Sequence, residues 1–153
     1  IDFQLPDRFN MTYIDKDGVK KRPYVIHRTS IGCYERTLAT LIEKYAGAFP
    51  TWLAPLQVKV LPISEKYHDY AETVVAKLKE SRIRVEADFR AEKIGYKIRE
   101  ARNERVPFLL IVGEKEAELN EVSVRSRKNA DEGAIALDSF ITRIKDEIDT
   151  KLL

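Results

Sequence analysis

The sequence has little of what would tie it to a membrane, a disulfide framework or a metal cluster. Its single cysteine, Cys33, excludes an internal disulfide and agrees with a reducing, cytoplasmic compartment. One cysteine also cannot build a cysteine-rich zinc site. No apolar run approaches the roughly 20 residues that span a bilayer, so we expect no membrane segment. Six glycines, six prolines and 44% hydrophobic residues are typical of a soluble globular protein.

Charge of one sign is not in excess either. The 27 basic residues nearly balance the 25 acidic ones, and the net charge of +2 does not by itself indicate a nucleic-acid partner. Any RNA-binding surface must therefore be local. The chain opens with Ile1-Asp-Phe-Gln, without an initiating methionine or an export signal, and we interpret it as part of a longer protein.

The first 50 residues read as a hairpin followed by a helix. Residues 9–14 and 23–29 are rich in β-branched and aromatic types, and Asp15-Lys-Asp-Gly18 between them predicts the hairpin turn. After Gly32 the apolar residues adopt helical spacing, which predicts a helix over 33–46 that stops at Gly47.

The proline-containing segment that follows marks a change in organisation. We expect residues 51–56 to be a connector between a small first part, residues 1–50, and an α/β domain, residues 57–153. Phe108-Leu-Leu-Ile-Val112 has no polar face, as in a central strand covered on both sides of a parallel or mixed sheet. The expected strands are 58–63, 83–87, 107–112 and 122–126; the expected helices are one capped by Ser64, 92–104 and 138–152; and 129–133 is expected to be a loop.

A glycine inside one of these helices needs an explanation. Lys93-Ile-Gly-Tyr-Lys-Ile-Arg-Glu100 lacks the glycine spacing of the phosphate-binding fingerprints. We therefore expect Gly95 to permit close packing of the helix against the sheet.

Three motifs in order resemble the threonyl-tRNA synthetases, a family of class II aminoacyl-tRNA synthetases. They are Ile26-His-Arg-Thr-Ser-Ile-Gly-Cys-Tyr-Glu-Arg36, the connector region from Ala46 to Val58, and the segment from Asp88 to Ala101. The resemblance implies the end of an antiparallel-sheet catalytic domain, with its third signature motif, joined to an anticodon-binding domain. It further implies an enzyme that activates threonine with ATP and charges threonine-specific tRNA as a homodimer. On this interpretation the chain mainly binds the anticodon and is inactive alone.

The resemblance assigns roles to three residues of the first part. Arg36 matches the arginine that binds ATP, and a planar, always-charged guanidinium suits phosphate and purine. His27 matches one of the zinc ligands, whereas Cys33 matches a position of the substrate pocket. Without the resemblance, an exposed arginine paired with Glu35 or Glu43 and a structural histidine are the default interpretations. Zinc and ATP with magnesium are thus expected in the full-length enzyme, and no cofactor is expected to bind this fragment tightly.

Anticodon contacts are expected in the second part. Anticodon bases are unpaired, so side chains can read their edges while basic groups hold the backbone. The resemblance indicates Glu116, an acceptor for a guanine edge, and Arg125, a bidentate donor, and Arg125-Ser-Arg-Lys128 is interpreted as part of the RNA face. Further candidates are Lys115, Arg105 and Arg90, whereas Ala91 replaces an asparagine that contacts RNA in the family.

Two other interpretations remain. Charged side chains of this kind are equally typical of an ordinary solvated surface. The chain could also be a stand-alone RNA-binding accessory module that uses an anticodon-binding fold. The Glu35-Arg36 pair and His27 favour the enzyme, because an accessory module has no need of them.

Overall fold

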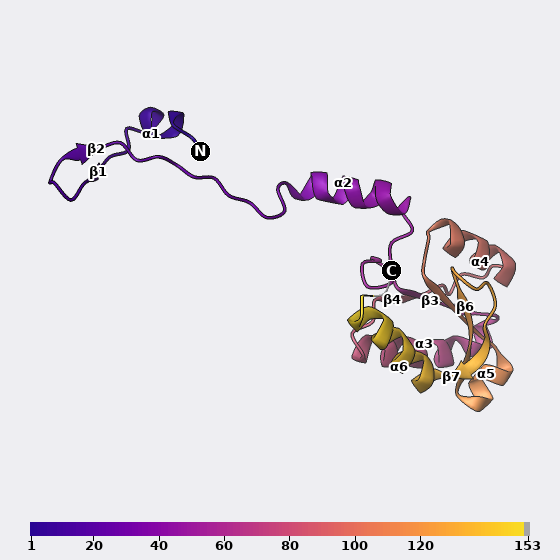
Figure 1. Ribbon diagram of the computed structural model, residues 1–153. Coiled ribbons are helices and arrows are strands. Elements are labelled where there is room, and N and C mark those ends of the chain that lie inside the picture. Colours follow the sequence, from indigo (N-terminus) through magenta and orange to yellow (C-terminus); the bar gives the residue numbers. More distant parts are fainter. Residues whose placement is uncertain (152–153) are drawn as a thin grey trace. The chain divides into compact units, whose positions relative to one another are not determined.

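A computed structural model describes residues 1–151, which form two compact units that divide between Ala39 and Thr40 (Figure 1). The first unit holds the short helix α1 (Gln4–Arg8) and the hairpin strands β1 (Tyr13–Ile14) and β2 (Lys20–Lys21). Helix α2 (Tyr34–Tyr45) crosses the division. No helix among residues 1–151 has the length and apolar character needed to cross a membrane.

The hairpin turn forms where the sequence predicts it, but the second strand does not. Gly18 adopts a φ of +74°, and its N–H donates to the carbonyl of Asp15. This tight turn places Lys20 and Lys21 directly opposite Ile14 and Tyr13. The predicted strand over 23–29 is wrong: the turn fixes the register, so these residues lie past the end of β1. Only an isolated bridge joins Val25 to Asp2 in that segment.

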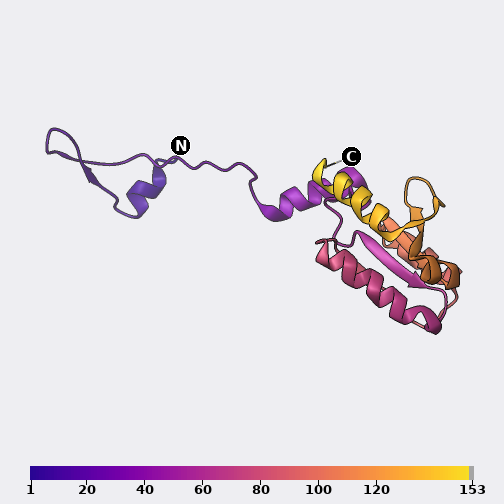
Figure 2. The same cartoon turned by 90° about the horizontal axis from the view of Figure 1, so that it is seen from below.

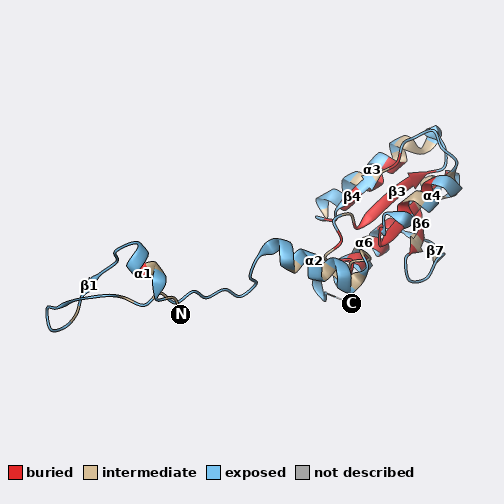
Figure 3. Ribbon diagram, turned by 90° about the horizontal axis from the view of Figure 1, so that it is seen from above, coloured by how far each residue is buried: buried red, intermediate tan, exposed pale blue. Residues whose placement is uncertain are grey.

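Helix α2 confirms the predicted helix to within one residue at each end. It ends because Ala46 and Gly47 both adopt positive φ angles, and the N–H of Gly47 returns to the carbonyl of Ile42. None of its residues is buried. Figure 3 shows this helix mostly in the colour of exposed residues.

The second unit is built on a five-stranded mixed sheet in the order β4-β3-β5-β6-β7. Strand β3 runs parallel to both β4 and β5, whereas β6 and β7 are antiparallel to their neighbours. The predicted α/β architecture with a mixed sheet is therefore confirmed. The strands are β3 (Val58–Pro62), β4 (Val85–Ala87), β5 (Phe108–Val112), β6 (Glu121–Ser126) and β7 (Gly133–Ala136).

Helices cover the sheet on both faces. Helices α3 (His68–Glu80) and α6 (Leu137–Asp149) pack on one face, and α4 (Ile94–Asn103) packs on the other (Figures 1 and 2). The larger core joins Val58, Val60 and Val124 of the sheet to Phe140 of α6. Burial of β5 on both faces explains why its sequence has no polar side. Side chains that alternate along β6 thus point to different layers: Val122 and Val124 towards α3 and α6, and Arg125 towards the α4 face.

Several local expectations need correction. The side chain of Ser64 makes no capping bond, and a 3₁₀ turn, η1 (Glu65–Tyr67), precedes α3. A methyl group added at Gly95 would meet nothing within 4 Å, so close packing does not explain that glycine. The sequence also did not predict helix α5 (Glu114–Leu119), nor strand β7, which begins at the last residue of the expected 129–133 loop.

Candidate nucleic-acid interface

A concave surface lined by five basic residues of the second unit is a pocket of about 380 Å³ on the α4 face of the sheet. It opens where α4 ends, β5 begins and β6 ends. A volume of this size is typical of ligand sites. We call it the basic pocket, and its lining residues are Arg102, Arg105, Val106, Leu109, Arg125, Ser126, Arg127, Lys128 and Ala130.

Arg125 reaches this pocket from strand β6 of the sheet. Its partner in the β5–β6 register is Leu109, which supplies apolar floor. One guanidinium nitrogen, Nη2, donates to Oδ2 of Asp131 at 2.6 Å. The Nε atom is buried and has no partner within the described part of the chain. A buried donor of this kind carries a desolvation cost, and because the atom is closed to solvent an acceptor would reach it only after the side chain moved.

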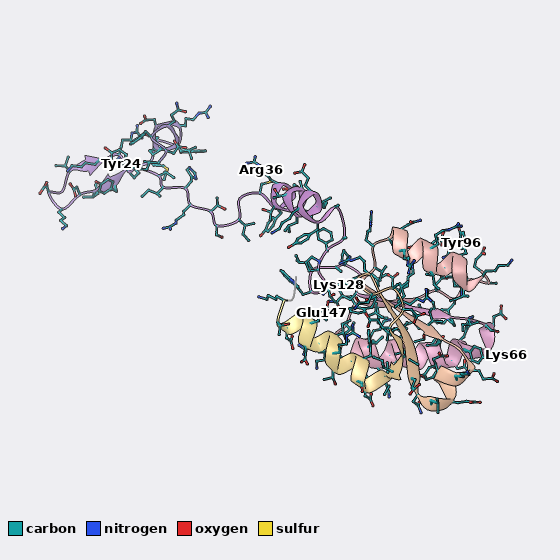
Figure 4. The ribbon with its side chains drawn as sticks, turned by 45° about the vertical axis from the view of Figure 1, so that its right-hand side comes forward. Tyr24, Arg36, Lys66, Tyr96, Lys128 and Glu147 are labelled. Carbon is teal, nitrogen blue, oxygen red and sulfur yellow. The ribbon has the colours of Figure 1, made fainter. Side chains whose placement is uncertain are left out.

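Arg127 forms the wall between the pocket and the start of the domain. Its Nη1 donates to the carbonyl of Arg105 at 2.9 Å, and its Nη2 donates to the carbonyl of Phe49 at 2.6 Å. Burial and then the nearby positive charge of Arg105 lower the pKa of Arg127, with Glu147 opposing. The guanidinium stays charged, and its positive charge is only partly compensated. An anion in the pocket would therefore be stabilised. Lys128 and Glu147, which are labelled in Figure 4, lie beside this region.

Arg90 lies at the other end of the strands, after β4, and is held by two carboxylates. Its Nε and Nη2 donate to Asp88 at 2.9 and 2.6 Å, and Nη2 also donates to Glu100. The side-chain bond from Arg90 is the largest cause that lowers the pKa of Asp88 to about 2. Glu100 is further bound by the hydroxyl of Tyr96 at 2.7 Å. Arg90 is thus occupied by internal bonds.

Lys115 and Glu116 lie on α5, directly after β5. An oxygen of Glu116 accepts the N–H of Gly113 at 3.0 Å, which ties the carboxylate to the start of its own helix. Its charge also contributes, after burial, to raising the pKa of Tyr70. Glu116 therefore has a structural contact in this state, and its second carboxylate oxygen is the acceptor it can offer to a base.

The five predicted anticodon contacts divide between two ends of the sheet. Arg105 and Arg125 come together in the basic pocket, at the end where β5 begins. Arg90, Lys115 and Glu116 lie at the end where β4 and β5 finish. Sequence reasoning missed Arg102, which lies in the last turn of α4 and lines the same pocket as Arg105. The signal in the sequence was a pair of arginines, Arg102 and Arg105, three positions apart near the end of a predicted helix, where basic side chains are favoured.

The predicted residues of the first unit do not line the basic pocket. Arg36 lies in the first turn of α2 and is exposed (Figure 4). The thiol of Cys33 donates to Glu35 at 2.7 Å, and this bond is the first cause that lowers the pKa of that carboxyl. Nε2 of His27 lies 3.4 Å from Oδ2 of Asp2.

A zinc ion does not fit the residues that surround His27. Over residues 1–151, no group of three or more histidine, cysteine, aspartate or glutamate side chains is arranged to hold a metal. His27 and Asp2 would leave two of the four positions of a tetrahedral ion unfilled.

Comparison with known proteins agrees with this α/β architecture. Residues 57–147 match the family of anticodon binding domains. The chain belongs to this family. The matched range begins at the first residue after the predicted connector and covers all five strands of the sheet.

Named relatives are longer proteins. The chain is 74% identical over 151 residues to the threonine–tRNA ligase of Clostridium botulinum strain Eklund 17B, which is 99% of this chain and 24% of that protein. It is 71% identical over 148 residues to the ligase of Clostridium perfringens strain SM101, covering 97% of this chain and 23% of the relative. The chain thus spans about a quarter of the length of these curated relatives.

A solved structure shows the same arrangement. The crystal structure of the RNA binding domain of threonyl-tRNA synthetase from Cryptosporidium parvum Iowa II superposes with a TM-score of 0.74 at 38% identity. It covers 95% of this anticodon-binding chain and 37% of the other chain.

Proposed function

We propose that this chain is the tRNA-binding end of a threonine–tRNA ligase, which activates threonine with ATP and charges threonine-specific tRNA. The observation that carries the proposal is the 74% identity over 99% of the chain to a threonine–tRNA ligase. The longer protein would act as a homodimer in the cytoplasm. By itself the chain would bind the anticodon and would not charge tRNA.

Within this proposal the basic pocket holds RNA backbone and at least one base edge. Cations that neutralise phosphates give affinity, and the planar donor groups of a guanidinium can also read a purine edge. Arg105 and Arg125 would contact RNA first, supported by Arg102 and Lys128. Lys115, Glu116 and Arg90 would contact the anticodon only from the other end of the sheet.

The residues of the first unit belong to the ligase reaction of the longer protein. Arg36 would bind ATP with magnesium, and Cys33 would line the threonine pocket. His27 would give zinc a single ligand, so the remaining ligands would have to come from residues other than those that the structure describes.

A binding experiment tests the RNA part of the proposal. The chain should bind the anticodon stem-loop of threonine tRNA more tightly than a stem-loop with altered anticodon bases at the same salt concentration. Arg125→Gln should reduce this preference, and Arg105→Gln should lower the slope of log affinity against log salt by about 0.7, as expected for one phosphate contact to a single strand. Lys79→Gln, on α3 and therefore on the opposite face, is the matched control.

Equal affinity of the unaltered chain for both stem-loops would refute anticodon reading. The accessory-module alternative is tested separately by joining the chain to the rest of the ligase. Arg36→Ala in the full-length protein should impair threonine-dependent exchange between ATP and pyrophosphate, and unchanged exchange would remove the ATP role of Arg36.

A further inference from the structure

The connector is bound to the α/β domain by side chains that donate to its main-chain carbonyls. Nη2 of Arg84 donates to Trp52 and Nε of the same residue donates to Ala54, both at 2.9 Å. Nε2 of Gln57 donates to the carbonyl of Thr51 at 2.9 Å. The carbonyl of Phe49, just before the connector, accepts from Arg127 at 2.6 Å.

These donors come from distant parts of the domain. Arg84 precedes β4 at the sheet edge, whereas Arg127 follows β6. The hydroxyl of Thr51 adds a bond to Glu147 of α6. One segment of chain is thus fastened to three elements that are far apart in sequence.

The bonds differ in burial: the Gln57 bond to Thr51 is buried, the Arg84 bond to Ala54 is partly buried, and the arginine bonds to Trp52 and Phe49 are exposed. Gln57 is fully buried, and Thr51 is 4% exposed. Both polar atoms of the Gln57 side-chain amide are bonded, because its Oε1 also accepts the N–H of Arg84 at 2.9 Å. The exposed arginine bonds are strengthened by the guanidinium charge, and the buried Thr51 carbonyl would cost free energy if it lost its Gln57 donor. A connector held in this way moves with the domain and does not act as a flexible linker.

We propose that Arg84 and Arg127 are positioning residues that hold residues 49–56 rigidly on the anticodon-binding domain, with Arg127 linking this segment to the wall of the basic pocket. The rigidity stands on the contacts above. Its consequence rests on the proposed function: in the ligase, the two arginines would favour charging without touching threonine, ATP or the anticodon bases.

Trp52 provides the readout, because it is the only tryptophan of the chain and lies in the connector. Arg84→Gln should shift Trp52 emission to the red, lower its anisotropy and increase acrylamide quenching at least twofold. Arg84→Lys should restore part of the change, since a lysine can replace one of the two bonds. The matched control is Arg82→Gln, two residues away on the same turn, which should leave Trp52 unchanged.

Unaltered quenching and anisotropy in Arg84→Gln, with the variant folded by circular dichroism, would overturn the proposal. Hydrogen exchange of the unmodified chain provides a second test that needs no variant. The amides of Leu53 and Ala54, both bonded to the carbonyl of Pro50, should exchange as slowly as amides of β3. Exchange at the rate of an open loop would also overturn it.

In the full-length ligase, Arg84→Gln should lower kcat for charging several-fold while KM for tRNA and the exchange of ATP with pyrophosphate stay unchanged. An unchanged kcat would remove the positioning role. The outcome is separable from the proposed function: a rigid connector in a chain that does not bind RNA would contradict only the proposed function. RNA binding with a mobile Trp52 would contradict only this inference.

Discussion

Acid should weaken the second unit in part through the buried carboxylate of Asp88. Its side chain is 3% exposed and accepts two side-chain bonds and one main-chain N–H from Arg90. These bonds, together with the positive charge of Lys97, lower the pKa of Asp88 from 3.8 to about 2, although burial opposes them. The folded protein therefore holds this carboxylate ionised at a pH where the unfolded chain protonates it.

The magnitude follows from the difference between the two pKa values. It corresponds to about 2.5 kcal/mol, and because half of the Arg90 side chain is open to solvent we expect about 1–2 kcal/mol. For a carboxyl with a lowered pKa, this stabilisation is fully present above pH 4 and is lost as the pH falls from 4 towards 2. Asp88→Asn should lack it at every pH.

Urea unfolding followed by Trp52 fluorescence measures this contribution. Between pH 6 and pH 2.5, the free energy of unfolding of the unmodified chain should fall by about 1 kcal/mol more than that of Asp88→Asn. Asp138→Asn is the control, because that side chain is 86% exposed and has one long ion pair. It should follow the unmodified chain within a few tenths of a kcal/mol. Parallel pH profiles for Asp88→Asn and the unmodified chain would refute the reasoning.

Three further changes in stability can be measured by the same urea titrations. Gly95→Ala should stabilise by about 0.5–1 kcal/mol, because α4 has space for the methyl group and alanine loses less backbone entropy; destabilisation would mean that the helix has less room than the structure shows. Phe140→Ala should cost about 3–5 kcal/mol, since the ring is fully buried and packs edge-on against Phe108 at 5.6 Å; a loss below 1 kcal/mol would contradict this core. Tyr70→Phe should cost about 1 kcal/mol through the lost 2.7 Å bond to the carbonyl of Glu121, and unchanged stability would show that the bond adds nothing.

The sequence predicts the sheet well where burial dictates composition. Strand β5 is apolar throughout because both of its faces are covered, so its five residues are recognisable without neighbours. Helix α5 is short and has no apolar stripe, since Glu-Lys-Glu-Ala-Glu-Leu offers only two apolar positions. Strand β7, Gly-Ala-Ile-Ala, is composed mostly of residues with little strand preference and forms because β6 provides an edge.

The candidate site is harder to predict because it depends on register and on main-chain acceptors. Arg102 and Arg127 are 25 positions apart in sequence and meet because β6 returns antiparallel along β5. Neither hydrophobic periodicity nor motif spacing predicts that these two residues line the same pocket. The carbonyls of the connector are likewise invisible in a sequence, so the roles of Arg84 and Gln57 appear only in the folded chain.

The two ends of the sheet should contribute to RNA binding in different ways. At the end where β4 finishes, Arg90 is bonded to two carboxylates, so RNA would have to displace internal bonds before it could use this cation. At the end where β5 begins, Arg125 has one ion pair, with Asp131, and among residues 1–151 the bonds of Arg127 go to main-chain carbonyls. RNA phosphates there gain attraction without breaking an ion pair of Arg127. Affinity should therefore come mainly from the basic pocket. Groups at the opposite end should add selectivity only for an RNA whose new contacts gain more free energy than is lost with the internal bonds they replace.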